Sequence, residues 1–143
     1  TTQVFLSNID LSADTYLLFR VSTDNGTTFK TTDYQQSTLT INSGAPVASK
    51  TGIPQSYLYA PGTYQAGSGT NEHTSGTWVI HNPADTTSYQ HVKFDVGVED
   101  NAGQGMSLIS GMGQWRGTTA VNGFQFYPQT GTFTGTYVVT ELN

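Results

Sequence analysis

Five side chains in the sequence are of the types that bind ligands by stacking or hydrogen bonding: Tyr57, Tyr59, Tyr64, His73 and Trp115. All but Trp115 lie in residues 42–76, a stretch rich in Gly, Ser and Pro. Adaptable binding loops combine aromatic rings with Ser, Gly and Asn, because rings give a large contact area at small entropic cost. We therefore expect these five residues to contact a ligand, for example by stacking on the apolar face of a sugar. Core packing or a subunit contact is the alternative for each of them.

The three histidines, His73, His81 and His91, are the only other candidate metal ligands besides the acidic residues. A zinc site needs about three side chains that converge on the metal at about 2 Å. Strand spacing does not bring these three histidines together, and two of them lie at the ends of predicted strands. We predict no metal site and no cofactor, with a metal shared across a symmetry axis as the alternative.

The acidic residues raise the question of glycoside hydrolysis, which needs two carboxylates about 5 to 10 Å apart. Asp95, Glu99 and Asp100 are close in sequence, while Asp24 and Asp33 flank the first predicted hairpin. Asp24 precedes Asn-Gly and is typical of a turn. No Gly-x-Ser-x-Gly motif supports a serine hydrolase. We predict no catalytic residue and no enzyme, and keep a glycosidase acting through Asp95 and Glu99 as an alternative.

Composition excludes several kinds of partner. The chain has 143 residues, no cysteine, only 10% charged residues and a net charge of −5. Nucleic-acid binding depends on clustered cations, so the charge argues against it. No apolar stretch approaches the roughly 18 residues of a membrane span, so we expect no membrane insertion. The length fits a single domain over residues 1–143, and the Thr-Thr-Gln start suggests a C-terminal fragment of a longer chain.

The elements that must position these side chains are strands, because apolar and polar residues alternate with a period of two. The clearest segment is 91–98, in which Val92, Phe94, Val96 and Val98 share one face. Asn25-Gly26 predicts a tight turn between two strands. The other predicted strands are residues 16–22, 27–31, 34–41, 77–81, 106–110, 113–116, 123–127 and 135–142.

Many short strands separated by Gly, Pro, Asn and Asp predict an all-β fold. We expect an antiparallel β-sandwich, jelly-roll-like, of about eight to ten short strands. Residues 42–76 lack a clear strand pattern. A structureless loop of this length is improbable in a compact domain. Either a strand is hidden around residues 55–59, or the segment is a functional loop ordered by a partner.

Three segments, residues 18–29, 75–83 and 122–137, resemble the distal domains of bacteriophage tail-fibre and receptor-binding proteins. In the last segment, an alternating aromatic strand runs into a Thr-Gly turn and then a Gly-Thr strand. The resemblance implies a β-sandwich that forms a homotrimer, binds a receptor on the host surface and carries no catalysis.

We therefore expect a non-catalytic viral adhesion domain at a tail-fibre tip, extracellular on the virion, whose partner is a glycan or protein receptor on a bacterial surface. Two alternatives remain. One is a carbohydrate-binding module of a secreted enzyme, which would be monomeric. The other is a structural virion decoration domain, in which residues 42–76 make subunit contacts.

Overall fold

The computed structural model describes residues 1–42, 44, 46–60, 65–99, 101 and 105–142, with only the backbone of residues 53 and 54. Over these residues the chain forms ten strands in two antiparallel sheets, and no helix. Within the same residues there is accordingly no helix long and apolar enough to cross a membrane. The two sheets pack face to face, which confirms the predicted all-β antiparallel sandwich.

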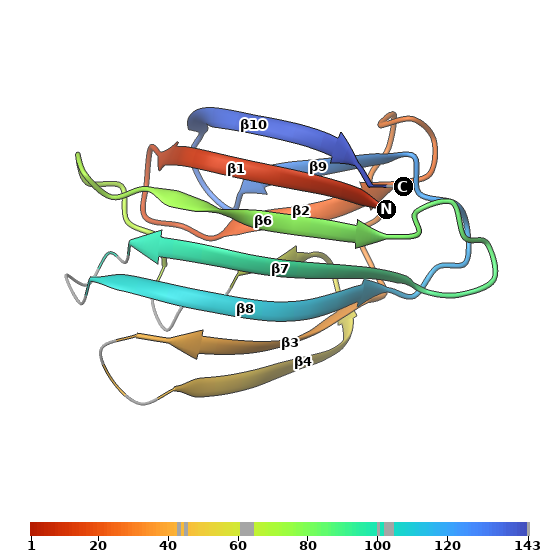
Figure 1. Ribbon diagram of the computed structural model, residues 1–143, viewed down its shortest axis with the longest axis horizontal. Coiled ribbons are helices and arrows are strands. Elements are labelled where there is room, and N and C mark those ends of the chain that lie inside the picture. Colours follow the sequence, from red (N-terminus) through yellow and green to blue (C-terminus); the bar gives the residue numbers. More distant parts are fainter. Residues whose placement is uncertain (43, 45, 61–64, 100, 102–104, 143) are drawn as a thin grey trace.

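The larger sheet has seven strands in the order β10-β1-β6-β7-β8-β3-β4 (Figure 1). Its members are β1 (Thr2–Leu11), β3 (Tyr34–Ile41), β4 (Val47–Gln55), β6 (Thr74–His81), β7 (Gln90–Glu99), β8 (Met106–Trp115) and β10 (Phe133–Glu141). Strands β4 and β10 are its two edges. The chain ends meet beside the β1–β10 pair, where Thr1 and Leu142 exchange backbone hydrogen bonds of 2.8 and 3.3 Å.

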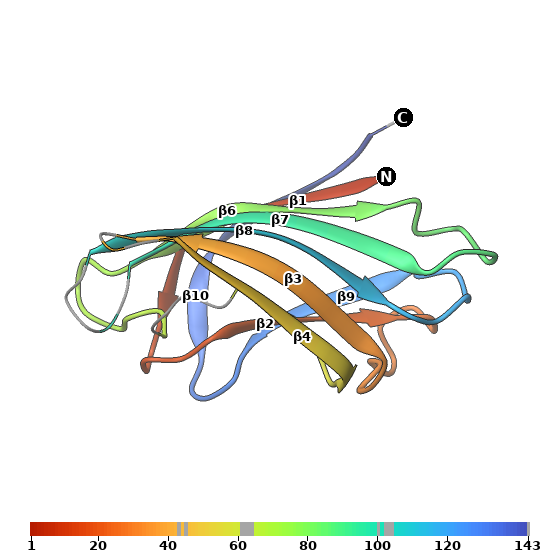
Figure 2. The same ribbon diagram turned by 90° about the horizontal axis from the view of Figure 1, so that it is seen from below.

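The smaller sheet has the order β5-β2-β9 and lies under the concave face of the larger one (Figure 2). It consists of β2 (Leu17–Ser22), β5 (Leu58–Tyr59) and β9 (Gly123–Pro128). Side chains alternate across a strand, so each of these strands has one face toward the core and one face away from the larger sheet. In β2, Leu17, Phe19 and Val21 belong to the core.

Stacked aromatic rings join the two sheets. The Trp78 ring lies 4.5 Å from Phe94 and 5.3 Å from Phe19, measured between ring centroids. Phe19 also contacts Phe126 of β9, whose tilted ring lies 5.2 Å away. Trp78, Phe19 and Phe94 are fully buried. Such pairs add stabilisation beyond the burial of apolar area, so this stack fixes the position of the small sheet against the large one.

Two glycines of β8 make room for the core. A Cβ atom on Gly111 would lie 2.4 Å from the Phe94 ring, and one on Gly113 would lie 2.6 Å from the Leu58 side chain. The Gly-Met-Gly sequence at this point therefore serves packing: it lets β5 and the aromatic stack approach the sheet closely.

Most predicted strands are confirmed. Strand β7 contains residues 91–98 with the expected buried face, and strands β2, β6, β9 and β10 correspond to residues 16–22, 77–81, 123–127 and 135–142. Residues 106–110 and 113–115 form one strand, β8, because Gly111 and Met112 between them stay paired with β3 and β7.

The predicted strand over residues 27–31 is wrong. Asn25 and Gly26 adopt the positive φ values of 56° and 81° expected of the turn, but β2 pairs with β5 and β9 instead. The carboxylate of Asp24 accepts hydrogen bonds from the backbone N–H and hydroxyl of Thr28, at 2.9 and 2.6 Å. This side chain closes a compact loop, and the chain returns to β2 through the bond from the Lys30 N–H to the Val21 carbonyl at 2.9 Å, without forming a strand.

Residues 42–76 contain more regular structure than expected. The strand suspected around residues 55–59 exists as β5, and β4 precedes it as the hairpin partner of β3. Ala66 forms an isolated antiparallel bridge with Thr15. On β3, Leu39 and Ile41 lie on the solvent face, because Tyr34, Gln36, Thr38 and Thr40 point inward.

Candidate functional site

Four tyrosine rings gather on the outer face of the small sheet. We call Tyr16, Tyr57, Tyr59 and Tyr127 the tyrosine platform. In the strand register, Leu18 of β2 lies opposite Tyr59 on one side and Tyr127 on the other. Their neighbours Phe19, Leu58 and Phe126 point to the core, so Tyr59, Leu18 and Tyr127 share the opposite face.

Edge-to-face contacts hold three of the four rings of the platform. The Tyr59 ring lies 5.5 Å from Tyr16 and 5.8 Å from Tyr57, at interplanar angles of 69° and 81°. These are favourable arrangements for aromatic pairs. All four tyrosines are half-buried, so part of each side chain remains accessible. The platform therefore offers several ring surfaces with fixed mutual orientation.

One cation belongs to the platform. The guanidinium carbon of Arg20 lies 4.7 Å from the centroid of the Tyr127 ring, a cation–π contact. Its Nε donates a 3.0 Å hydrogen bond to the carbonyl of Ser56, the residue before Tyr57. Gln125 of β9 lies directly opposite Arg20 in the register and places an amide on the same face. Arg20 thus ties β9 to the chain that leads into β5.

Two phenol groups of the platform, those of Tyr59 and Tyr127, have a raised pKa. Burial, with smaller contributions from Tyr16 and Tyr57, raises the pKa of Tyr59 above its ordinary value of 10.0. Burial also raises the pKa of Tyr127, although Arg20 acts against it. The hydroxyl of Tyr127 is enclosed and has no hydrogen-bond partner among the described residues. The platform combines tyrosine rings, one fixed positive charge and an amide.

Strand β5 is only two residues long, and Gln36 anchors it. This side chain, 3% exposed, extends from β3 of the large sheet and bonds both backbone groups of Tyr59. On the other side, Leu58 packs over Gly113. The larger sheet therefore determines where the Tyr57 and Tyr59 rings lie.

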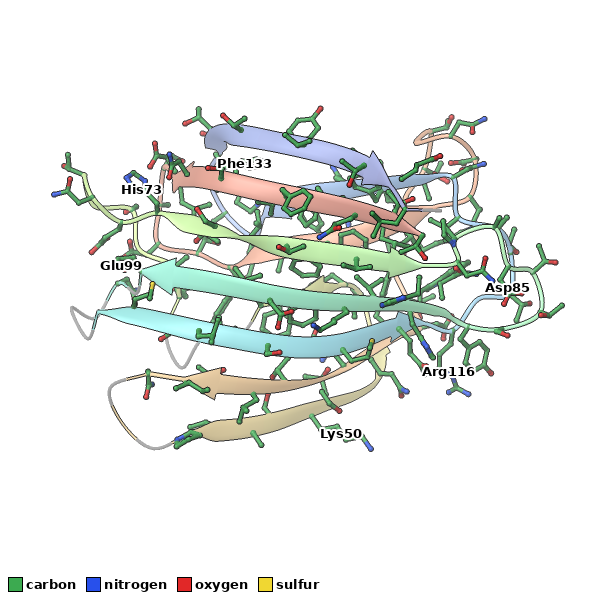
Figure 3. The ribbon with its side chains drawn as sticks, in the orientation of Figure 1. Lys50, His73, Asp85, Glu99, Arg116 and Phe133 are labelled. Carbon is green, nitrogen blue, oxygen red and sulfur yellow. The ribbon has the colours of Figure 1, made fainter. Side chains whose placement is uncertain are left out.

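The structure brings two of the five sequence-predicted residues together, Tyr57 and Tyr59. Tyr64 lies outside the described residues. His73 precedes β6 and its Nδ1 pairs with the carboxylate of Asp10, at the end of the large sheet opposite the one that holds Arg116 (Figure 3).

Trp115 is placed differently from the expectation of an exposed stacking ring. It is 7% exposed and belongs to the core cluster, with its ring against Gly117, where a Cβ would lie 2.1 Å away. Lys30 lies above the ring, with its Nζ 5.7 Å from the centroid. The neighbours of Trp115 leave little of the ring for a ligand, so packing explains its position.

Sequence reasoning missed Tyr16, Arg20, Gln125 and Tyr127 as members of a site. The signal was present in part: Arg20 falls on the solvent face of the predicted strand 16–22, and Tyr127 closes the strand 123–127. What the sequence did not reveal was that β2 lies between β5 and β9, which makes these residues neighbours.

Asp95 and Glu99 are not arranged as the pair of carboxylates that glycoside hydrolysis needs, and Asp100 lies outside the described residues. Asp95 is bound to Lys93 at 2.8 Å and accepts a hydrogen bond from Ser110, and these two contacts lower the pKa of its carboxyl. A general acid in glycoside hydrolysis needs a raised pKa instead. Glu99 is four residues along the same strand, about 13 Å away at 3.3 Å per residue.

The histidines likewise form no metal cluster: no group of three or more His, Asp or Glu residues in the described ranges is arranged to hold an ion. His81 and His91 face each other across β6 and β7, and His91 Nε2 lies 3.1 Å from the amide oxygen of Gln114.

Two further surfaces are apolar and exposed. On the outer face of the large sheet, Leu39, Ile41, Leu108 and Met112 lie on adjacent strands β3 and β8. At the other side of the sandwich, a cleft of about 590 Å³ opens between β9 and the β1–β10 pair. Its walls include Leu6, Ile9, Phe124, Phe126, Phe133 and Tyr137.

Comparison of the chain with protein-family models, with curated proteins and with solved structures finds no match.

Proposed function

We propose that this chain is a non-catalytic adhesion domain that binds a cell-surface glycan through the tyrosine platform. The observation that supports this most directly is the arrangement of Tyr16, Tyr57 and Tyr59, whose half-buried rings meet edge to face on the outer face of the small sheet. Tyrosines give apolar ring surface together with hydroxyl groups at low entropic cost, which suits the apolar face and hydroxyl rim of a sugar.

We further propose that the domain belongs to a viral tail fibre and acts as a homotrimer on a bacterial surface, as the resemblance of three segments to such domains implies. A shallow site of this kind is expected to bind a glycan with millimolar affinity, about −4 kcal/mol. Linked copies raise the apparent affinity by about 10² to 10⁴ without new contacts. Trimerisation would therefore compensate for a weak individual site.

The test is binding to arrayed bacterial polysaccharides, comparing the wild type with the double variant Tyr57→Ala/Tyr59→Ala. The backbone of Tyr59, and not its ring, bonds Gln36, so removing the rings leaves the anchor of β5 in place. We expect binding to fall about tenfold or more, as loss of about 1.4 kcal/mol implies. Tyr137→Ala is the matched control, because Tyr137 is 68% exposed on β10, outside the platform. Equal binding by the wild type and the double variant would contradict the proposal.

A structural virion domain is the second candidate, and the exposed Leu39, Ile41, Leu108 and Met112 favour it. A contiguous apolar surface commonly marks a protein contact. Molar mass in solution separates the candidates further: three times 15.4 kDa agrees with the trimeric fibre domain, whereas a monomer favours a carbohydrate-binding module of a secreted enzyme.

A further inference from the structure

Arg20 has a fixed position, and no acceptor among the described residues engages its terminal N–H groups. Its Nε is engaged by the Ser56 carbonyl, and its guanidinium plane lies over Tyr127. In the described residues Arg20 forms no ion pair, whereas Lys93 is paired with Asp95. The terminal N–H groups of Arg20 likewise have no hydrogen-bond acceptor in this part of the chain.

A fixed guanidinium with free terminal N–H groups is suited to one chemical group above others. Arginine donates two parallel hydrogen bonds to a planar carboxylate, and these are stronger than bonds between neutral groups. The surface beside Arg20 includes tyrosine rings and the amide of Gln125. The site therefore offers a guanidinium group that can bind a carboxylate, together with ring surfaces on which the apolar face of a sugar can lie.

From this combination we infer that the ligand of the tyrosine platform is an acidic sugar, whose carboxylate binds Arg20 and whose ring lies on the tyrosines. The inference rests on the proposed function, since it names the chemical class of the glycan bound at the same site.

The net charge of −5 does not oppose this inference. Repulsion between the whole protein and an anionic glycan acts over long distances, and salt at physiological strength screens it beyond about 8 Å. The contact between the carboxylate and Arg20 is direct, so salt weakens it less than it weakens the long-range repulsion. An acidic glycan is therefore recognised by one local cation, and not by a general positive field.

The experiment uses three acidic oligosaccharides, of galacturonate, glucuronate and sialate, each beside its carboxyl-reduced neutral form. Titration calorimetry on the wild type is expected to give at least one pair in which the acidic form binds about tenfold more tightly, as one strong charged hydrogen bond implies. In Arg20→Gln this preference is expected to disappear while the neutral form still binds. Arg20→Lys, which keeps the charge but loses the planar fork, should retain part of the preference.

Arg116→Gln is the matched control, because Arg116 also lies over a tyrosine, Tyr89, at 5.0 Å, but outside the platform. Equal binding of the acidic and neutral forms, no binding of any acidic form, or the same loss of preference in Arg116→Gln would overturn the inference. A different result would contradict the proposed function. In that case, Tyr57→Ala/Tyr59→Ala would bind its glycan as tightly as the wild type does. Thermal unfolding of each variant verifies that it is folded.

Discussion

The side-chain amide of Gln36 bonds both backbone groups of Tyr59: its Nε2 donates to the carbonyl at 2.8 Å, and its Oε1 accepts from the N–H at 2.9 Å. Gln36 belongs to the large sheet and Tyr59 to the small one. A single side chain thus replaces a neighbouring strand for β5, which is otherwise paired only with β2 in the described residues.

Replacing Gln36 by Leu should therefore loosen β5 and the platform together. Two partly buried backbone groups would lose their partner, at a cost of about 2 kcal/mol in the free energy of unfolding. Chemical denaturation measures this cost. Gln35→Leu is the control, because Gln35 lies on the solvent side of the same strand and should change stability by less than about 0.5 kcal/mol. Equal effects of the two substitutions would refute the anchoring role.

Gly113→Ala should destabilise the fold by about 1 to 3 kcal/mol through overpacking. The new Cβ would lie 2.6 Å from Leu58 and push β5 away from the sheet. Gly52→Ala provides the comparison, since nothing lies within 4 Å of a Cβ there. Thermal unfolding should show a lower Tm for the first variant and an unchanged or slightly higher Tm for the second.

The buried hydroxyls of Tyr127 and Tyr34 should respond in opposite ways to removal. The Tyr127 hydroxyl has no hydrogen-bond partner in the described residues, so Tyr127→Phe should leave the free energy of unfolding unchanged or raise it. The Tyr34 hydroxyl accepts from the N–H of Val21 at 2.9 Å and donates to the carbonyl of Lys30 at 3.3 Å. Tyr34→Phe should therefore cost about 1 to 3 kcal/mol. A loss of stability in Tyr127→Phe as large as that in Tyr34→Phe would contradict the assignment.

Asp24 predicts a particular form of acid sensitivity. Hydrogen bonds from the Thr28 hydroxyl, the Thr28 backbone N–H and the Ser22 hydroxyl lower the pKa of its carboxyl from 3.8 to about 2. Because the folded-state pKa lies below the ordinary value, the stabilisation is complete above pH 3.8 and is lost as the pH falls toward 2. In Asp24→Asn, the Tm should therefore decrease less than in the wild type as the pH falls from 3.8 to about 2.

The comparison for this effect is Asp33→Asn, because in the described residues the carboxylate of Asp33 has no hydrogen-bond partner, and Asn tolerates its φ of 68°. A pH profile of Asp24→Asn that parallels the wild type would show that the loop does not depend on the charged form.

Alternation predicted the strands whose core residues keep a strict period of two, such as β7. It failed for β1, where Val4 and Leu6 point inward but a bulge with Asn8 at φ 50° shifts the following core positions to Ile9 and Leu11. One inserted residue breaks the period, so no uniform pattern marks the strand.

The site was predicted only where the sequence itself concentrates tyrosines. Tyr57 and Tyr59 are neighbours along the chain, whereas Tyr127 and Arg20 join them through the order β5-β2-β9. Strand order depends on which turns close and which strands the core rings hold together. The local propensity of the sequence does not contain that information. The loop closed by Asp24 shows this, because a strand was predicted where the chain forms a loop.

The joined chain ends have a mechanical consequence. Thr1 and Leu142 are bonded to each other, and β1 and β10 run antiparallel away from that point. A load pulling the two ends apart would open the ladder one residue pair at a time, starting at Thr2 and Glu141. A load between one end and the tyrosine platform would instead cross the stack of Trp78 and Phe19, and many contacts would have to yield together. Tension arriving from a bound surface would thus meet the more resistant direction of the fold.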